Sequence, residues 1–229
     1  MKISVVIPAY NEEKNIADTI QAVLAQDYND FEVIVVNNAS KDKTAEVASK
    51  FPVNLVHEQR KGLLWARECG RVNAKGDLIV NIDADCLPDS NWLSNGVRHF
   101  TDPSIVAVTG PYDYHDGDWL FRNVSLQIQK HLYHLMNSTI QFPYIKKGAV
   151  LIGGNNFIRS EVLKKTGGYN TALVFYGEDT DTAKRVSKYG KVKFDKNLQM
   201  KTSARRFKDE GTLNITIKYI YHFFKVIFS

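Results

Sequence analysis

Asp83 and Asp85 have the type and spacing to hold a metal ion. They follow the apolar run of the segment DLIVNIDAD, where a strand would end. Hard divalent cations such as Mg²⁺ and Mn²⁺ prefer oxygen ligands, and they commonly combine few protein carboxylates with phosphate oxygens. The pair could therefore hold such a cation and the ribose of a nucleotide diphosphate. The alternative is that both carboxylates only cap the turn and helix near Pro88.

A second pair of carboxylates, Glu178 and Asp179, follows a glycine in the segment FYGEDTDTAKRVSKYG and begins a helical pattern. One carboxylate held close to a hydroxyl group could act as a general base and remove its proton. The alternative is structural, because acidic side chains in the first turn also stabilise a helix through its dipole.

Two adjacent arginines, Arg205 and Arg206, lie in the segment TSARRF. The planar guanidinium group suits a diphosphate, including one that leaves during a reaction. Paired arginines are equally typical of a solvated surface, so this motif alone does not indicate a function.

The elements that must position these residues alternate between strand-length apolar runs and longer amphipathic stretches. This alternation is typical of an α/β fold, with a mostly parallel central sheet and helices on both faces. Ligands of such sheets bind at the carboxyl ends of the strands, where Asp83 and Asp85 lie. We expect strands at 3–7, 31–36, 53–56, 78–82 and 105–108, and helices at 11–26, 40 or 42–50, 63–73 and from 88 to about 100.

The second half of the chain is less regular. A long amphipathic stretch covers 118–136, and an apolar run at 149–157 is interrupted by Gly153 and Gly154. No linker separates the two halves, so we expect one domain over 1–210, with a nucleotide-binding half at about 1–110 and an acceptor-binding half at 111–210.

Composition excludes several classes of protein. The chain has 229 residues, of which 44% are hydrophobic and 24% are charged, as in ordinary soluble globular domains. Its two cysteines, Cys69 and Cys86, form no C-x-x-C motif, which disfavours a disulfide framework or a thiolate zinc site. The apolar run at 3–7 is too short for a signal peptide, and no window reaches the roughly 18 apolar residues of a membrane span. We therefore expect a cytoplasmic protein.

The charge is divided unevenly along the chain. Residues 1–183 carry 18 Lys+Arg and 22 Asp+Glu, a net charge of −4, whereas residues 184–229 carry 12 and 3, a net charge of +9. A basic C-terminal segment predicts an anionic partner: phosphate, nucleic acid or lipid headgroups. Nucleic acid is disfavoured because no interleaved aromatic and basic motif accompanies the lysines and arginines.

The C-terminal tail, 211–229, has the pattern of an amphipathic helix, although the β-branched residues at 215–217 leave a strand open. The helix could pack on the enzyme's own core. It could instead lie on the inner leaflet of a membrane, with Lys201, Arg205, Arg206 and Lys208 facing anionic lipid. At 100° per residue, one face carries Leu213, Ile217, Ile220, Phe224 and Ile227, and another carries Asn214, Lys218, His222 and Lys225.

Taken together, these segments resemble the family 2 glycosyltransferases of the GT-A type, over nearly the whole chain. The six motifs occur in the family's order. They are VVIPAYNEE (5–13), VVNNASKDKT (35–44), KGLLWARECG (61–70), DAD (83–85), GGNNFIRSEVLKKTGGYN (153–170) and GED (177–179).

The resemblance implies a role for each matching residue. Asp85 would bind Mn²⁺ or Mg²⁺ at the two donor phosphates, with Asp83 beside it toward the ribose. Asp179, next to Glu178, would be the base, and Arg205 or Arg206 would neutralise the leaving diphosphate. The residues implied around the nucleotide are Pro8, Ala9, Tyr10, Glu12, Asn37, Asn38, Asp42 and Arg67. Those implied around the donor sugar and acceptor are Gly153, Gly154, Asn155 and Asn156.

The resemblance therefore implies an inverting enzyme that transfers one sugar from a nucleotide-diphosphate sugar to a hydroxyl acceptor. We expect a UDP-sugar as donor and a glycan or lipid-linked acceptor, in envelope polysaccharide or glycolipid synthesis at the cytoplasmic membrane face. Single transfer is favoured because neither spanning helices nor a Q-x-x-R-W motif occur. Two features depart from the family: Asn37 and Asn38 stand where aspartates are common, and His222 is the one histidine after the base motif.

Other classes of protein fit less well. A nicotinamide dehydrogenase or a nucleotidyltransferase would need a glycine-rich phosphate loop near the first strand, and MKISVVIPAYNEE contains no glycine. A non-catalytic nucleotide-sugar or glycan-binding relative remains the alternative, supported by the two asparagines.

Overall fold

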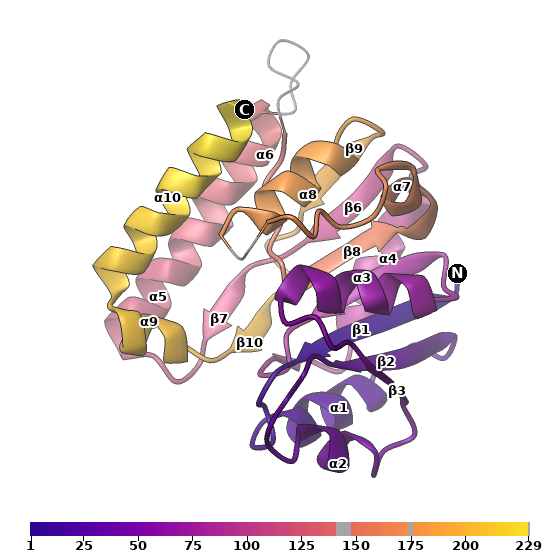
Figure 1. Cartoon of the computed structure of the whole chain (residues 1–229). Helices are drawn as coiled ribbons and strands as arrows, with labels where there is room; N and C mark the ends of the chain where they lie inside the picture. The colour runs from indigo at the N-terminus through magenta and orange to yellow at the C-terminus, as the bar shows by residue number, and fades with distance from the viewer. Residues whose placement is uncertain (141–147, 174–175, 229) are drawn as a thin grey trace.

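The computed structural model describes residues 1–140, 148–173 and 176–228, and its centre is a seven-stranded sheet (Figure 1). Six strands run parallel, and β8 alone is antiparallel to both of its neighbours. The predicted α/β class with a mostly parallel sheet is therefore confirmed. In spatial order the strands are β3 (Asn54–His57), β2 (Phe31–Asn37), β1 (Ile3–Ala9), β4 (Leu78–Ile82), β8 (Asn155–Arg159), β6 (Ile105–Thr109) and β9 (Lys191–Phe194).

Helices cover both faces of this sheet, because successive side chains of a buried strand point to opposite faces. Val5 belongs to one apolar cluster and Val6 to the other. The Val5 cluster includes residues of α1 (Ile16–Leu24), α2 (Thr44–Ala48) and α4 (Trp92–Val97). The Val6 cluster includes residues of α3 (Leu63–Asn73), α7 (Ser160–Lys165) and α8 (Glu178–Val186).

A second, three-stranded sheet ties the C-terminal part of the chain to the segment after Asp85. Its order is β5 (Leu87–Pro88), β10 (Met200–Thr202) and β7 (Tyr112–Tyr114). Because β10 pairs with β5, the helix that follows it, α9 (Arg205–Glu210), begins close to the Asp83–Asp85 segment. Strands of two or three residues are too short to leave a periodic pattern in a sequence, and this sheet was not predicted.

The remaining helices lie along one margin of the molecule (Figure 1). The stretch predicted at 118–136 forms α5 (Trp119–Ile128), a π-helical segment (Gln129–Tyr133) and α6 (His134–Ile140). The tail forms α10 (Thr212–Phe228), so the helical prediction is confirmed and the strand alternative is wrong. The division between a domain at 1–210 and a tail at 211–229 stays a prediction. Within the described part of the chain, no helix combines the length and apolarity needed to cross a bilayer.

Several predicted boundaries were wrong for local reasons. The helix expected at 11–26 begins only at Ile16, because the side-chain oxygens of Ser40 and Thr44 accept hydrogen bonds from the backbone amides of Asn11 and Glu12. In the apolar run at 149–157, for which no element was predicted, a strand begins at Asn155. The helix expected at 88–100 is divided into α4 and a 3-10 turn at Arg98–Thr101.

Candidate functional site

Three neighbouring parallel strands bring most of the predicted site residues to one edge of the sheet. Strands β1, β2 and β4 end at Ala9, Asn37 and Ile82, and their register places these ends at the same edge. The following loops carry Glu12, Asp42, Asp83 and Asp85. The carboxyl edge of the sheet is therefore the candidate site, as the fold class predicts.

Asp83 is held by two buried side chains from different elements. The hydroxyl of Tyr112 on β7 donates to Oδ2 of Asp83 at 2.9 Å, and Nη2 of Arg67 on α3 donates to Oδ1 at 3.4 Å. Burial, together with the negative charge of Asp83, raises the pKa of Tyr112, so its hydroxyl remains a donor. Tyr112 belongs to no motif, and sequence reasoning missed it.

Asp85 is a buried carboxylate that faces a guanidinium group. Burial raises its pKa to about 6, and the neighbouring charges of Asp83 and Glu12 add to this shift. Nη2 of Arg205 lies 3.6 Å from Oδ2 of Asp85 and 2.5 Å from Oε1 of Glu12. Arg206 instead lies against Tyr219 on α10. Of the two arginines, Arg205 is thus the one placed at the aspartate pair.

Glu178 and Asp179 begin α8 behind a left-handed glycine, Gly177, whose φ is 86°. Oδ1 of Asp179 accepts a hydrogen bond from the amide of Thr180 at 2.7 Å, and its Oδ2 has no hydrogen-bond partner among the described residues. Burial raises the pKa of both carboxyl groups, and their mutual repulsion raises that of Glu178 further. A raised pKa suits a group that must accept a proton.

Arg67 connects the two carboxylate pairs. Only 3% of this arginine is exposed, and its Nη1 lies 3.9 Å from Oε1 of Glu178 while its Nη2 reaches Asp83. Its Nε has no partner among the described residues. The predicted donor-side residue Arg67 therefore lies between the aspartate pair and the predicted base.

Gly153 and Gly154 pack against the same network. A Cβ on Gly153 would lie 2.7 Å from Nη2 of Arg67, and one on Gly154 would lie 2.2 Å from the carboxyl carbon of Asp83. The guanidinium and carboxylate groups fill the space that any side chain would need. The glycines are thus required for close packing at the site, and their contact with a sugar stays a prediction.

Asn155 and Asn156 lie in the interior, on β8. Oδ1 of Asn155 accepts from the indole of Trp92 at 2.9 Å, and its Nδ2 donates to the carbonyl of Leu198 at 2.8 Å. Oδ1 of Asn156 accepts from Nδ2 of Asn81 at 2.8 Å. Both amides hold the site in place, and a direct contact with an acceptor stays a prediction.

The residues predicted around the nucleotide surround the ends of β1 and β2. Pro8 and Ala9 end β1, and Tyr10 accepts a hydrogen bond from Nζ of Lys61 at 2.8 Å. Asp42 accepts from the amides of Glu13 and Thr44. These bonds offset the effect of burial and lower the pKa of Asp42, so it holds two loops together.

The two asparagines that replace aspartates have different surroundings. Both polar atoms of the Asn38 side chain are hydrogen-bonded: Nδ2 donates to the carbonyls of Glu58 and Arg60, and Oδ1 accepts from the amide of Gly62. Nδ2 of Asn37 lies 3.2 Å from Nδ1 of His57, whereas the buried Oδ1 of Asn37 has no partner among the described residues. Of the two, only Asn37 thus has a side-chain oxygen without a hydrogen-bond partner among the described residues.

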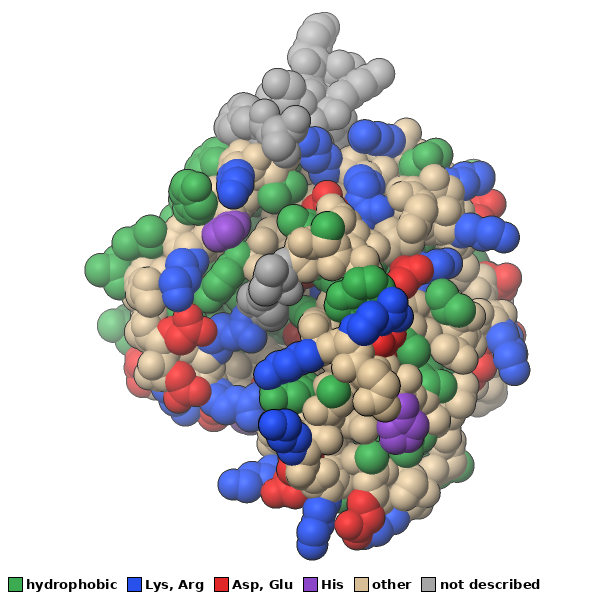
Figure 2. Space-filling view, viewed as in Figure 1, with side chains coloured by type: hydrophobic (Ala, Val, Ile, Leu, Met, Phe, Trp, Pro, Cys, Tyr) green, Lys and Arg blue, Asp and Glu red, His purple; other side chains and the backbone are tan. Residues whose placement is uncertain are grey.

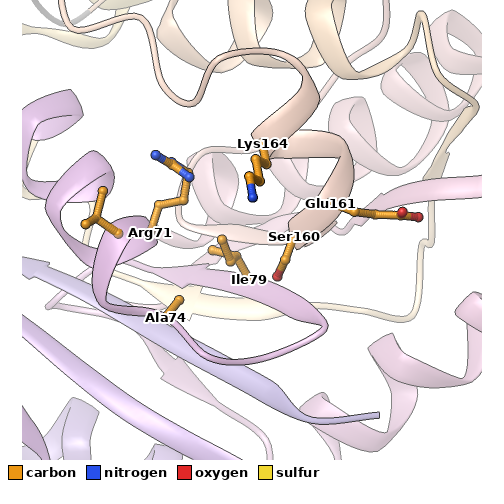
Figure 3. A pocket seen from close by; sticks show the side chains of 7 residues that line it. Arg71, Ala74, Ile79, Ser160, Glu161 and Lys164 are labelled. Carbon is orange, nitrogen blue, oxygen red and sulfur yellow. The ribbon is translucent and has the colours of Figure 1, made fainter.

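A cavity of about 340 Å³ lies at the opposite edge of the sheet (Figure 3). Its lining includes Ile79, near the start of β4, and Ser160, at the end of the antiparallel β8. The guanidinium of Arg71 in this lining is already paired with Glu68 at 2.6 Å. The cavity is far from the carboxyl edge, and we assign no chemistry to it.

Comparisons with known proteins identify the family to which the chain belongs. The family model described as "Glycosyl transferase family 2" matches residues 4–167. Glycosyltransferase AglE of Haloferax volcanii is 29% identical over 196 residues, which cover 82% of this chain and 62% of AglE. From the same organism, glucosyl-dolichyl phosphate glucuronosyltransferase is 25% identical over 181 residues, 75% of this chain and 56% of that protein.

Among solved structures, the mannosyltransferase PcManGT from Pyrobaculum calidifontis, in complex with GDP-Man and Mn²⁺, superposes with a TM-score of 0.77. The identity is 23%, and the match covers all of this chain but 64% of PcManGT. The chain thus spans about three fifths of the length of these relatives. The fold is of the GT-A type, with both carboxylate pairs at the carboxyl edge of the sheet, and the family model matches most of the chain. The protein therefore belongs to glycosyl transferase family 2.

Proposed function

We propose that the protein is an inverting glycosyltransferase that moves one sugar from a nucleotide-diphosphate sugar to a hydroxyl acceptor. The observation that carries this proposal is Arg67, which contacts Asp83 on the donor side and Glu178 beside the base. A single buried cation between two carboxylate pairs supports a site in which donor and acceptor chemistry take place together. The complex of PcManGT with GDP-Man and Mn²⁺ supports a nucleotide-sugar donor.

In this proposal Asp179 is the general base. Its Oδ2 takes the proton of the acceptor hydroxyl, because Oδ1 is already bonded to the amide of Thr180. The acceptor oxygen then forms a bond to the anomeric carbon on the face opposite the diphosphate. The bond from that carbon to the diphosphate oxygen breaks, and its electron pair leaves with the diphosphate. Attack from the opposite face inverts the configuration of the sugar.

Arg205 stabilises the departing diphosphate. In the structure its guanidinium contacts Glu12 and Asp85, so it lies where the donor phosphates must approach the aspartate pair. Charge that grows on a leaving group is stabilised by a fixed cation in a partly buried site. Arg206, which lies against Tyr219, is less suited to this role.

Asp85 and Asp83 would hold the divalent cation, Mn²⁺ or Mg²⁺. The described residues contain no cluster of three or more His, Cys, Asp or Glu side chains that could hold a metal ion alone. The donor set therefore fits an ion that completes its shell with phosphate and water oxygens, as Mg²⁺ commonly does. When bound, such an ion would neutralise the negative charge of the diphosphate.

Asn37 supports a UDP-sugar as donor. Its Oδ1 is buried and has no partner among the described residues, so the amide would have to turn toward the base to accept a hydrogen bond from a uracil N–H. For the acceptor, we propose a glycan or lipid-linked hydroxyl in envelope polysaccharide or glycolipid synthesis, at the cytoplasmic face of a membrane. The name of the glucuronosyltransferase from H. volcanii supports a lipid-linked acceptor.

The test is a panel of nucleotide sugars, measured for binding by calorimetry and for turnover, with and without Mn²⁺. We expect one donor to bind in the presence of Mn²⁺. Asp179→Asn should bind that donor within about twofold of the parent but transfer sugar at least about a thousandfold more slowly. Asp181→Asn, on the same helix but paired with Arg185 at 2.8 Å, is the control and should keep its turnover.

Two outcomes would contradict the proposal. Unchanged turnover in Asp179→Asn would remove the base. Tight donor binding without turnover, over a broad set of acceptors, would favour the non-catalytic sugar-binding alternative.

A further inference from the structure

Most of the apolar face of the C-terminal helix α10 points away from the protein, although Ile227 at its end is buried. Leu213, Ile217 and Ile220 share one face of the helix and are 75%, 57% and 53% exposed. The opposite side carries His222, whose ring stacks on Tyr176 with 5.4 Å between the centroids. An amphipathic helix that only completed the core of its own chain would bury the apolar face instead.

A second helix with the same property lies along the same margin. None of the residues of α5 is buried, and Trp119, Leu120 and Val124 are 77%, 63% and 47% exposed. The α5 helix is tied to the α9–α10 segment by the rings of Phe121 and Phe207, whose centroids lie 5.0 Å apart. Figure 1 shows α5 and α6 running alongside α10, and Figure 2 shows hydrophobic side chains gathered over this margin.

Both helical segments contain no carboxylate. None of the 25 aspartates and glutamates of the chain lies within 119–140 or 212–228, whereas these two ranges contain Arg122, Lys130, Lys218 and Lys225. Arg122 is paired with Asp113 and Lys218 with Glu210, whereas Lys130 and Lys225 form no ion pair with a described residue. Exposed apolar side chains, aromatic rings and cations are the features of helices that lie in the headgroup region of anionic membranes. Trp119 and Tyr221, both largely exposed, are residue types enriched at that depth.

We propose that α5 and α10 together form one membrane-docking face, which binds a bilayer containing anionic phospholipid. This membrane-docking face is defined by Trp119, Leu120, Val124, Leu213, Ile217 and Ile220. The proposal goes beyond docking through the tail alone, because half of the face belongs to a helix about a hundred residues earlier in the chain.

Helix α10, which carries half of the membrane-docking face, packs near the predicted base through another of its sides. Helix α10 packs on α8, and a Cβ on Gly177 would lie 3.0 Å from Cγ2 of Val226. Gly177 immediately precedes the pair Glu178 and Asp179. An acceptor held in the bilayer by a lipid would therefore reach the base from the side that docks. This step rests on the proposed function, whereas docking itself does not.

The experiment measures co-sedimentation of the full chain with phosphatidylcholine vesicles, with and without about one third phosphatidylglycerol. We expect binding to the anionic vesicles that weakens as salt is added. The variant I217N/I220N should bind roughly a hundredfold more weakly, about tenfold for each apolar side chain lost from the face. The variant W119S/L120S should reproduce this loss through the other helix.

Val72→Asn is the matched control. Val72 is 66% exposed but lies on α3, away from the membrane-docking face, and its replacement should leave vesicle binding unchanged. Donor binding and the unfolding midpoint are measured on every sample. A variant that loses vesicle binding but retains donor binding shows that the membrane-docking face acts separately from the active site. If the parent protein binds no nucleotide sugar, the proposed function is refuted, whereas the docking proposal is not affected.

Three results would overturn the proposal. The parent protein could ignore anionic vesicles, or both double variants could bind them as well as the parent does. A concentration-dependent dimer in sedimentation velocity, abolished by I217N/I220N and accompanied by no vesicle binding, would assign the face to a second copy of the chain.

Discussion

Replacing Asp85 by asparagine should stabilise the metal-free protein at neutral pH. Burial and neighbouring carboxylates raise the pKa of Asp85 from 3.8 to about 6 in the folded state. As pH rises from about 4 to 6, the unfolded chain therefore releases this proton before the folded chain does, and the folded state loses stability. A difference of about two pKa units corresponds to at most about 3 kcal/mol, fully present above about pH 6.

Asparagine carries no charge and removes this cost, although it also loses the contact with Arg205 at 3.6 Å. We expect Asp85→Asn to increase the free energy of unfolding by about 1–3 kcal/mol at pH 7.5. For a chain of this length, this gain raises the melting temperature by about 3–10 °C. Near pH 4 the difference in stability between the two proteins should vanish, because Asp85 is then protonated in the folded state and, like asparagine, carries no charge.

The assay is thermal and urea unfolding of both proteins after treatment with EDTA, across this pH range. Asp89→Asn is the control: its side chain is 66% exposed and paired with Lys201, so its replacement should change stability by less than about 1 kcal/mol. With Mn²⁺ and UDP added, the parent protein should gain stability and Asp85→Asn should gain little. A variant that is less stable at pH 7.5, or equally stabilised at pH 4, would refute the reasoning.

Further predictions concern the groups around Asp83 and the base. Arg67→Met should lower the free energy of unfolding by about 3–5 kcal/mol at pH 8 and by less at pH 5, measured by urea unfolding, because Glu178, whose pKa is raised to about 8, then becomes neutral. Tyr112→Phe removes one hydrogen bond to Asp83 and should weaken donor binding about five- to tenfold in calorimetry. The value of kcat/KM should fall toward low pH at a pKa above the ordinary value of about 4, because burial raises the pKa of Asp179.

The parallel half of the sheet could be predicted from sequence because its signals are local. β4 was predicted at the residues where it lies, since a buried parallel strand is a continuous apolar run and here ends at Asp83. α3 was likewise predicted at Leu63–Asn73. The strand β8 could not be placed, because its antiparallel position between β4 and β6 depends on pairing with residues 47 to 81 positions away in the sequence, for example Asn156 with Thr109.

The two carboxylate pairs were predicted from spacing and resemblance, but the contact of one arginine with both of them was not. Arg67 was expected near the nucleotide, whereas its contact with Glu178 depends on how α3 packs beside α8. Nothing in the sequence distinguished Arg205 from Arg206, since the direction of each depends on the three-stranded sheet before α9. The pattern of α10 predicted which residues share a face, but not that this face points outward.

The charges of the site explain why a cation should be needed for donor binding. Five carboxylates, Glu12, Asp83, Asp85, Glu178 and Asp179, are linked through only two guanidinium groups, those of Arg67 and Arg205. If all are ionised, the sum is −5 + 2 = −3. Burial is the main cause of the raised pKa values of Asp85 and Glu178, and repulsion by neighbouring carboxylates adds to it. A diphosphate brings further negative charge to a site that already repels it. A divalent cation at Asp85 would reduce the charge of the site to −3 + 2 = −1 and so weaken the repulsion, and Arg205 would then have phosphate oxygens to contact in place of the carboxylates.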